Sequence, residues 1–219
     1  MGSSTTSHGL TALQREVLRE FFRRENGFFL TGGGALVGYH LRHRSTDDLD
    51  LFTLDPAAFE RARRILPAVA EAVGATFEVR VAAPEFVRAA LVTATEALVV
   101  DLVRDRVKQV SPVKPVIDGI AVDPPEEILA NKLTALVGRQ EERDLVDVLR
   151  LEQAGHSVES ALAAALEKDG GCTPGALAWL LSQIQIPDGA VLPGGVPVAE
   201  LRRYVTELVR RLRRAAAPG

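Results

Sequence analysis

Three consecutive glycines near the start of the chain stand where a phosphate-binding turn would be expected. Gly32, Gly33 and Gly34 follow an apolar run at residues 27–30 and precede an amphipathic segment at residues 35–41. This pattern predicts a short strand, a tight turn and a helix. A glycine turn that opens a helix presents unbonded backbone N–H groups and the positive end of the helix dipole, which both favour a phosphate. The alternative is a flexible helix entry without a ligand.

Two aspartates follow this turn with the spacing of a metal site. Asp48 and Asp50 alternate with Leu49 and Leu51. On a strand the two carboxylates share one face, about 6 to 7 Å apart along the chain, while the leucines point into the core. The carboxylates repel each other unless a cation lies between them, and their oxygens suit Mg²⁺ or Mn²⁺. The pair therefore predicts a metal site for nucleoside triphosphate chemistry, or alternatively a solvated strand end, because aspartate is common in turns.

These residues, together with a later segment, are similar to a known protein family. The pairs Gly32-Gly33 and Asp48-x-Asp50 resemble the signature of the polymerase-beta-like nucleotidyltransferase superfamily. A longer resemblance is to the nucleotidyltransferase toxins of the abortive-infection (AbiEii/AbiGii) type. The segments that carry it are residues 31–36, 43–52, 126–136 and 143–147, all within residues 28–150.

The resemblance implies an enzyme that uses a divalent metal to move a nucleoside monophosphate from an NTP to an acceptor hydroxyl. Members of the superfamily use a third carboxylate from a neighbouring strand, as a metal ligand or general base. Asp101 is the natural candidate, because it lies within the apolar run at residues 97–103 and a charge there needs a partner. The alternative is a structural ion pair of Asp101 with Arg104 or Arg44.

Arg44 and Thr46 directly precede the aspartate pair and are expected at the nucleotide. A guanidinium beside the triphosphate would neutralise charge that develops on the leaving pyrophosphate. With Arg44, the backbone of Gly33 and Gly34 would hold the β and γ phosphates. The alternative for Arg44 is a salt bridge to Asp47 or Asp48.

Lys132, Asp144 and Asp147 belong to the later segment of the resemblance. The resemblance implies that Lys132 binds the triphosphate and that the two aspartates lie by the active site. Asp144 and Asp147 share one helical face at i and i+3, and Arg143 is placed to pair with Asp147. The alternatives are a solvated lysine and an ion-pair network that fixes helix packing.

The acceptor and partners follow from the resemblance alone. It implies the tRNA 3′ end or another RNA as acceptor, and a cognate antitoxin protein that restrains the enzyme. Other readings are a small-molecule acceptor such as an aminoglycoside, a protein acceptor, or a nucleotide-binding module without catalysis. The last predicted helix, at residues 198–214, is rich in arginine, which is typical of a solvated face and would also suit RNA phosphates.

Composition limits the class of protein. The chain has 219 residues, 47% hydrophobic and 25% charged, with a net charge of −3, as in ordinary globular proteins. The single cysteine, Cys172, rules out an internal disulfide and suits a reducing compartment. No apolar run approaches the roughly 20 residues of a membrane span, and no apolar signal core is seen at the start. We expect a cytoplasmic protein that does not bind membranes.

The pattern of elements predicts two halves. We expect an α/β (α+β) fold, with a polymerase-beta-like nucleotidyltransferase core and a mixed sheet at residues 1–122, followed by an all-helical domain at residues 123–219. Asp55 and Asp123 are expected as N-caps, each followed by proline. Helices are predicted at residues 10–26, 55–73, 141–153, 157–169, 174–184 and 198–214 and from Asp123 onward. Strands are predicted at residues 27–30, 75–82, 97–103 and 116–122 and around Asp48 and Asp50.

Overall fold

The computed structural model describes residues 9–217. The chain divides into two compact units, each described below by itself. The first unit comprises Met1–Val107 and Val113–Pro124. The second comprises Pro125–Gly219 together with the short segment Lys108–Pro112.

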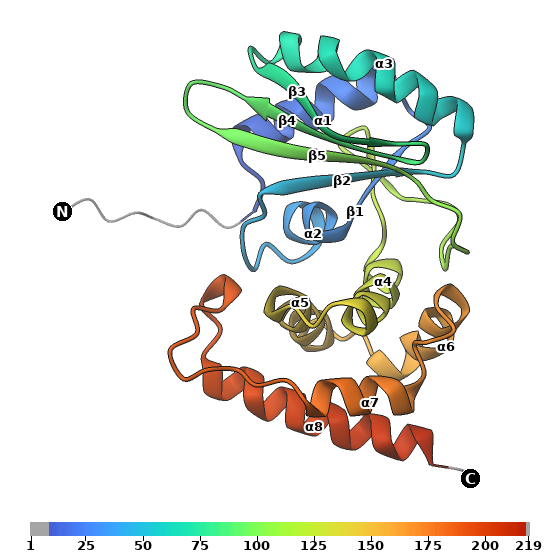
Figure 1. The fold of residues 1–219 in the computed structure, drawn as a ribbon, viewed down its shortest axis with the longest axis vertical. Helices are drawn as coiled ribbons and strands as arrows, with labels where there is room; N and C mark the ends of the chain where they lie inside the picture. Colours follow the sequence, from blue (N-terminus) through green and yellow to red (C-terminus); the bar gives the residue numbers. More distant parts are fainter. Residues whose placement is uncertain (1–8, 218–219) are drawn as a thin grey trace, which may run out of the picture. The chain divides into compact units, whose positions relative to one another are not determined.

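The first unit contains a five-stranded mixed sheet with the strand order β1-β2-β5-β4-β3 (Figure 1). Strands β2 and β5 are parallel, and the other neighbours are antiparallel. The strands are β1 (Phe29–Thr31), β2 (Asp48–Thr53), β3 (Thr76–Ala83), β4 (Phe86–Val92) and β5 (Ala97–Arg104). A separate two-stranded ribbon pairs β6 (Val116–Ile117) with β7 (Ile120–Ala121). The mixed α/β architecture predicted from the sequence is confirmed.

Two helices, α1 (Ala12–Arg24) and α3 (Pro56–Ala72), lie together over one face of this sheet (Figure 1). The apolar residues that alternate along the strands, such as Leu49 and Leu51, are fully buried. Burial of one face in this way fixes the register, because a slip of one residue would turn the leucines outward. The residues between them therefore project from the opposite face of the sheet.

The helix ends in this unit follow local sequence signals. Thr11 and Gln14 form a reciprocal capping box at the start of α1. Asp55 caps α3 as predicted, because its carboxylate accepts a hydrogen bond from the backbone N–H of Ala57. After α3, Gly74 adopts a φ of 69°, the left-handed conformation in which a helix commonly ends.

Three local predictions need correction. The helix after the glycines is not a regular α-helix: a single turn, α2 (Gly32–Ala35), continues as a π-helix, η1 (Leu36–His40). Strand β4 was not predicted at all. Asp123 does not directly precede its helix, which begins at Pro125, and its carboxylate instead forms a buried ion pair with Lys114 at 2.7 Å.

The second unit is helical, as predicted. Its α-helices are α4 (Pro125–Gly138), α5 (Glu142–Gln153), α6 (Val158–Lys168), α7 (Pro174–Ser182) and α8 (Val198–Ala216). The predicted loop between the last two helices contains only a short 3₁₀ turn, η2 (Pro193–Gly195). Within residues 9–217, no helix is long and apolar enough to span a membrane.

Candidate active site

Four polar residues form a row across four neighbouring strands of the sheet. Thr31 on β1 pairs with Asp50 on β2, Asp50 pairs with Asp101 on β5, and Asp101 pairs with Arg88 on β4. Residues directly opposite each other in a sheet project from the same face. The row therefore lies on one face, and the buried leucines of β2 show that it is the face away from α1 and α3. We call these four residues the polar row.

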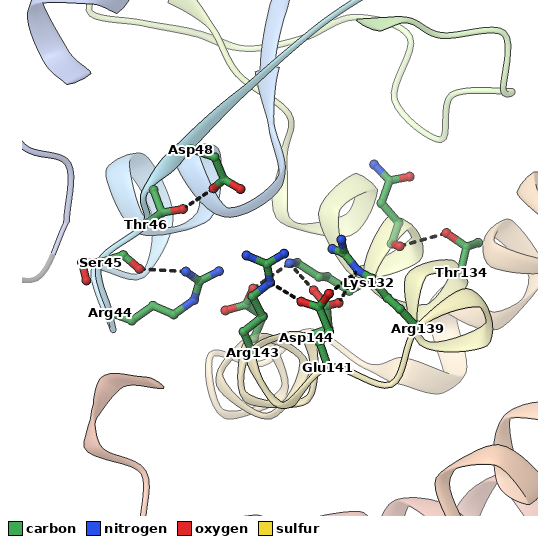
Figure 2. Close-up of polar contacts among 12 residues, drawn as sticks. Arg44, Ser45, Thr46, Asp48, Lys132, Thr134, Arg139, Glu141, Arg143 and Asp144 are labelled. Atoms are coloured by element: carbon green, nitrogen blue, oxygen red, sulfur yellow. Dashed lines mark hydrogen bonds and ion pairs between the residues drawn. The ribbon is translucent and has the colours of Figure 1, made fainter. Parts of the chain in front are cut away.

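Asp48 and Asp50 share this face, as the sequence predicted. Both side chains are half-buried, whereas Leu49 and Leu51 between them are fully buried. The hydroxyl of Thr46 donates a hydrogen bond to Oδ1 of Asp48 at 2.6 Å (Figure 2). This bond orients one carboxylate of the pair without neutralising its charge.

Gly32 is required by the close approach of Asp50. Its φ is +59°, a conformation that residues with a side chain rarely adopt. A Cβ at this position would lie 2.3 Å from Oδ2 of Asp50, which is shorter than any real contact. The carboxylate of Asp50 is therefore seated against the main chain of the glycine turn.

Gly33 is covered by the two residues that precede the aspartate pair. A Cβ there would lie 3.0 Å from both Nη2 of Arg44 and Oγ1 of Thr46. Both of these side chains are buried, and Nη1 of Arg44 donates to the backbone oxygen of Ser45 at 2.8 Å (Figure 2). The structure thus brings together the turn, Arg44, Thr46 and the first aspartate.

Gly34 has a packing role. A Cβ at this position would lie 3.1 Å from Leu30 and 3.3 Å from Leu49, both of them core residues. A side chain there would have to displace the core. Any phosphate contact of Gly34 would therefore have to come from its backbone, and that contact stays a prediction.

Asp101 is held by an arginine that the sequence analysis did not single out. Nε and Nη2 of Arg88 donate to the two carboxylate oxygens of Asp101 at 2.9 and 2.7 Å. The Asp101 side chain is 6% exposed and that of Arg88 is 47% exposed. The proposed alternative of an ion pair is thus observed, but with Arg88, whereas Arg104 pairs with Glu85.

The bidentate bond to Asp101 raises the pKa of Arg88, and the charges of Asp48 and Asp50 add to this effect. The negative charges of Asp48, Asp50 and Asp101 therefore all stabilise the charged guanidinium of Arg88. A sequence signal was present, because Arg88 is the only charged residue in a segment of otherwise apolar residues, 86–92. Without the pairing of β4 with β5, that signal did not point to Asp101.

The oxygen ligands of the polar row and Asp48 match the chemistry of a divalent metal. Among the described residues, no group of three or more His, Cys, Asp or Glu side chains is arranged to hold a metal ion. Asp48, Asp50 and Asp101 nevertheless supply the hard oxygen ligands that Mg²⁺ and Mn²⁺ prefer. The buried hydroxyl of Thr31, next to Asp50 in the polar row, has no hydrogen-bond partner among the described residues. The chemistry of the donors fits the metal, with Arg88 as the cation now bound to Asp101.

Lys132, Asp144 and Asp147 form a buried cluster within the second unit. Nζ of Lys132 lies 2.6 Å from Oδ1 of Asp144 (Figure 2). It also lies 2.8 Å from Oδ2 of Asp147. Arg139 adds a bond to Asp144 at 3.0 Å. Burial alone would lower the pKa of Lys132, but the charges of Asp147 and Asp144 outweigh it and raise the pKa. The lysine is therefore not solvated. The ion-pair network proposed as an alternative exists, with Lys132 and Arg139 as its cations. Arg143 pairs with Glu141.

Comparison with known families decides the class of protein. The family model described as "Nucleotidyl transferase AbiEii toxin, Type IV TA system" matches residues 16–215. The chain belongs to this family. It is therefore a nucleotidyltransferase of the toxin–antitoxin class, and membership implies an NTP substrate, usually a divalent metal, and an antitoxin partner. The resemblance found in the sequence is confirmed.

Solved structures show the same fold. The JHP933 protein of Helicobacter pylori is 19% identical, with 93% of this chain and 92% of that chain covered and a TM-score of 0.55. MenT4, a nucleotidyltransferase toxin of Mycobacterium tuberculosis, is 16% identical, with 90% and 82% covered and a TM-score of 0.60. At these identities the likeness concerns the fold. Comparison with curated protein sequences gives no significant match.

Most arginines of helix α8 in this AbiEii-family chain form ion pairs within the protein. Arg202 pairs with Asp188, and Arg210 pairs with Glu207. Burial tends to raise the pKa of Glu152, but hydrogen bonds from Arg211 and Tyr204 outweigh it and lower the pKa. Arg211 therefore helps to fasten α8 to α5.

Proposed function

We propose that this AbiEii-family nucleotidyltransferase uses Mg²⁺ or Mn²⁺ to transfer a nucleoside monophosphate from an NTP to an acceptor hydroxyl, releasing pyrophosphate. The observation that carries the proposal is the polar row with its neighbour Asp48. Asp50 and Asp101 lie opposite each other on parallel strands, and the glycine turn lies directly against Asp50. Family membership supports the reaction class, and the carboxylates support the metal.

The three aspartates would have different roles in the reaction. Asp48 and Asp50 would hold the metal against the triphosphate, with Asp48 oriented by Thr46. A bound metal would stabilise charge on the entering and leaving oxygens. Asp101 would accept the proton of the acceptor hydroxyl, and Arg88, which bonds to both of its oxygens, would hold this carboxylate in place.

The phosphates would be bound by backbone and cationic groups. The backbone N–H groups of Gly33 and Gly34 and the guanidinium of Arg44 are expected to bind the β and γ phosphates. Lys132 is expected to contribute by family resemblance, with Asp144 and Asp147 holding its ammonium group in place.

We further propose RNA, and the tRNA 3′ end in particular, as the acceptor. This step rests on the resemblance to abortive-infection toxins. Transfer onto that end would block its use in translation, and a cognate antitoxin would prevent this. A small molecule such as an aminoglycoside, or a protein, remains the alternative acceptor, and each would give a different labelled product.

The experiment is to incubate the full-length protein with each α-³²P-labelled NTP, Mg²⁺ and, separately, total RNA, total protein or an aminoglycoside. Label in the tRNA band supports the proposal, and label elsewhere replaces the acceptor. Asp48→Asn should abolish labelling. Asp47→Asn is the matched control, because this neighbouring side chain is exposed and should be dispensable. Equal labelling by both variants would contradict the metal assignment.

A further inference from the structure

We propose that Arg88 is an internal counter-ion that withholds Asp101 from the metal, and that divalent cation binding exchanges one partner of Asp101 for the other. The inference rests on the proposed function, because it assumes that Asp101 is the third carboxylate of the site. It adds a residue from β4 that neither the sequence motifs nor the family description assigns. Arg88 would thus be a positioning residue, acting through Asp101.

The geometry favours exchange because only one partner is fixed. Asp101 is buried in the central parallel pair of the sheet, with Asp50 directly opposite. The side chain of Arg88 is half-exposed and reaches in from the neighbouring strand. A partly solvated guanidinium can move away without disturbing the core, whereas the buried carboxylate stays in the polar row.

Arg88 contacts an aromatic ring at the same time as it bonds to Asp101. Its guanidinium lies 5.6 Å from the centre of the Phe86 ring, two residues earlier on the same strand. A cation over an aromatic face is stabilised even at a partly exposed site. When the bond to Asp101 is released, the ring still holds the guanidinium near the site.

Charge gives the exchange its direction. The three carboxylates Asp48, Asp50 and Asp101 lie on one face of the sheet and attract the guanidinium of Arg88, which bonds to both oxygens of Asp101. A divalent cation placed among the same oxygens would repel the guanidinium. The two cations therefore compete, and Arg88 must weaken binding of the free metal. In this structure each carboxylate oxygen of Asp101 accepts one hydrogen bond from Arg88.

The competition can be measured without nucleotide. Mn²⁺ binding to the full-length protein, followed by electron paramagnetic resonance or calorimetry, should tighten about two- to tenfold in Arg88→Gln, the range for loss of a partly exposed charge-assisted contact. Arg88→Lys keeps the charge but not the two-pronged bond, and should give an intermediate affinity. Arg80→Gln is the matched control, because Arg80 is an exposed arginine on β3 that pairs with Glu78. It should not alter Mn²⁺ binding.

A double-mutant cycle assigns the effect to Asp101. In an Asp101→Asn background, Arg88→Gln should tighten Mn²⁺ binding much less than it does in the wild type, because the contested ligand is gone and only the repulsion between the two cations remains. Unchanged or weaker Mn²⁺ binding in Arg88→Gln itself would overturn the inference and make the pair purely structural. Because no NTP is present, the result is independent of transfer. If Asp101→Asn abolishes labelling but Arg88→Gln does not change Mn²⁺ affinity, the proposed function is supported and the role of Arg88 is rejected.

Discussion

Asp50 on β2 lies directly opposite Asp101 on β5, in a parallel pair whose strands are not neighbours in the sequence. Adjacent strands are about 4.8 Å apart, so two acidic residues on one face are held close together by the backbone itself. The cost of this repulsion is offset by the ion pair of Asp101 with Arg88, while the carboxylate of Asp50 lies close to Gly32. The pairing of strands across the sheet therefore determines where the carboxylates of the site lie, and the glycine turn adjoins Asp50.

Gly32→Ala should destabilise the first unit by about 1 to 3 kcal/mol and abolish transfer. The left-handed backbone is strained by a Cβ, and that Cβ would push Asp50 out of place. Urea unfolding and the labelling assay measure the two effects. Gly138→Ala is the control, because no atom lies within 4 Å of its Cβ position and the residue ends a helix. A stable, active Gly32→Ala protein would show that the turn tolerates a different path.

Asp50→Asn should leave the melting temperature without ligand unchanged or slightly higher, because it relieves repulsion with Asp48 and Asp101. The rise in melting temperature caused by Mg²⁺ and NTP together should disappear. Thermal melting with and without these ligands measures both. If the variant gains as much from the ligands as the wild type does, Asp50 does not bind the metal.

Lys132→Met tests two roles at once. Removal of the ammonium group leaves Asp144 and Asp147 buried without their cation, so unfolding should become easier by about 3 to 5 kcal/mol. If Lys132 also binds the triphosphate, calorimetry on the folded protein should show NTP affinity weaker by about 1 to 3 kcal/mol. Unchanged affinity together with lower stability would leave only the structural role. Arg139→Gln, which removes a second bond to Asp144, is the control for general disturbance of the cluster.

What the sequence predicted correctly was carried by local patterns. The alternation of Leu49 and Leu51 with aspartates predicted β2 and its faces, and Asp55 before Pro56 predicted the start of α3. Strand β4 was missed because small residues such as Ala89 and Ala90 favour strands only weakly.

The role of Arg88 could not be predicted from the sequence for a different reason. It depends on which residue of β5 lies opposite, and register comes from the whole sheet. The buried network of Lys132 likewise depends on how α4 packs against α5, which the spacing of residues along a single helix does not reveal.

Glu152→Gln should lower stability at pH 7 by more than at pH 3. Its pKa is lowered in the folded protein, so its contribution is present above the ordinary value of 4.5 and is lost as the pH falls through the folded pKa. Urea unfolding at a series of pH values gives the profile. Glu167→Gln, which removes an exposed partner of Lys108, should show little dependence on pH. A Glu152 variant whose deficit is constant down to pH 3 would contradict the lowered pKa.

The last prediction concerns RNA docking by α8, and the ion pairs decide which residues can test it. Arg211 is fastened to Glu152, so its removal would disturb folding. Arg203 and Arg213 form no ion pair with any described residue, and are the arginines best placed to meet phosphates. Replacing both with Gln should weaken RNA binding and reduce the slope of log affinity against log salt by up to about 0.9 per lost contact, because phosphate contacts release counterions. Arg63→Gln with Arg80→Gln changes the net charge equally at exposed sites of the first unit. Equal slopes for the two double variants would mean that α8 presents ordinary surface charge.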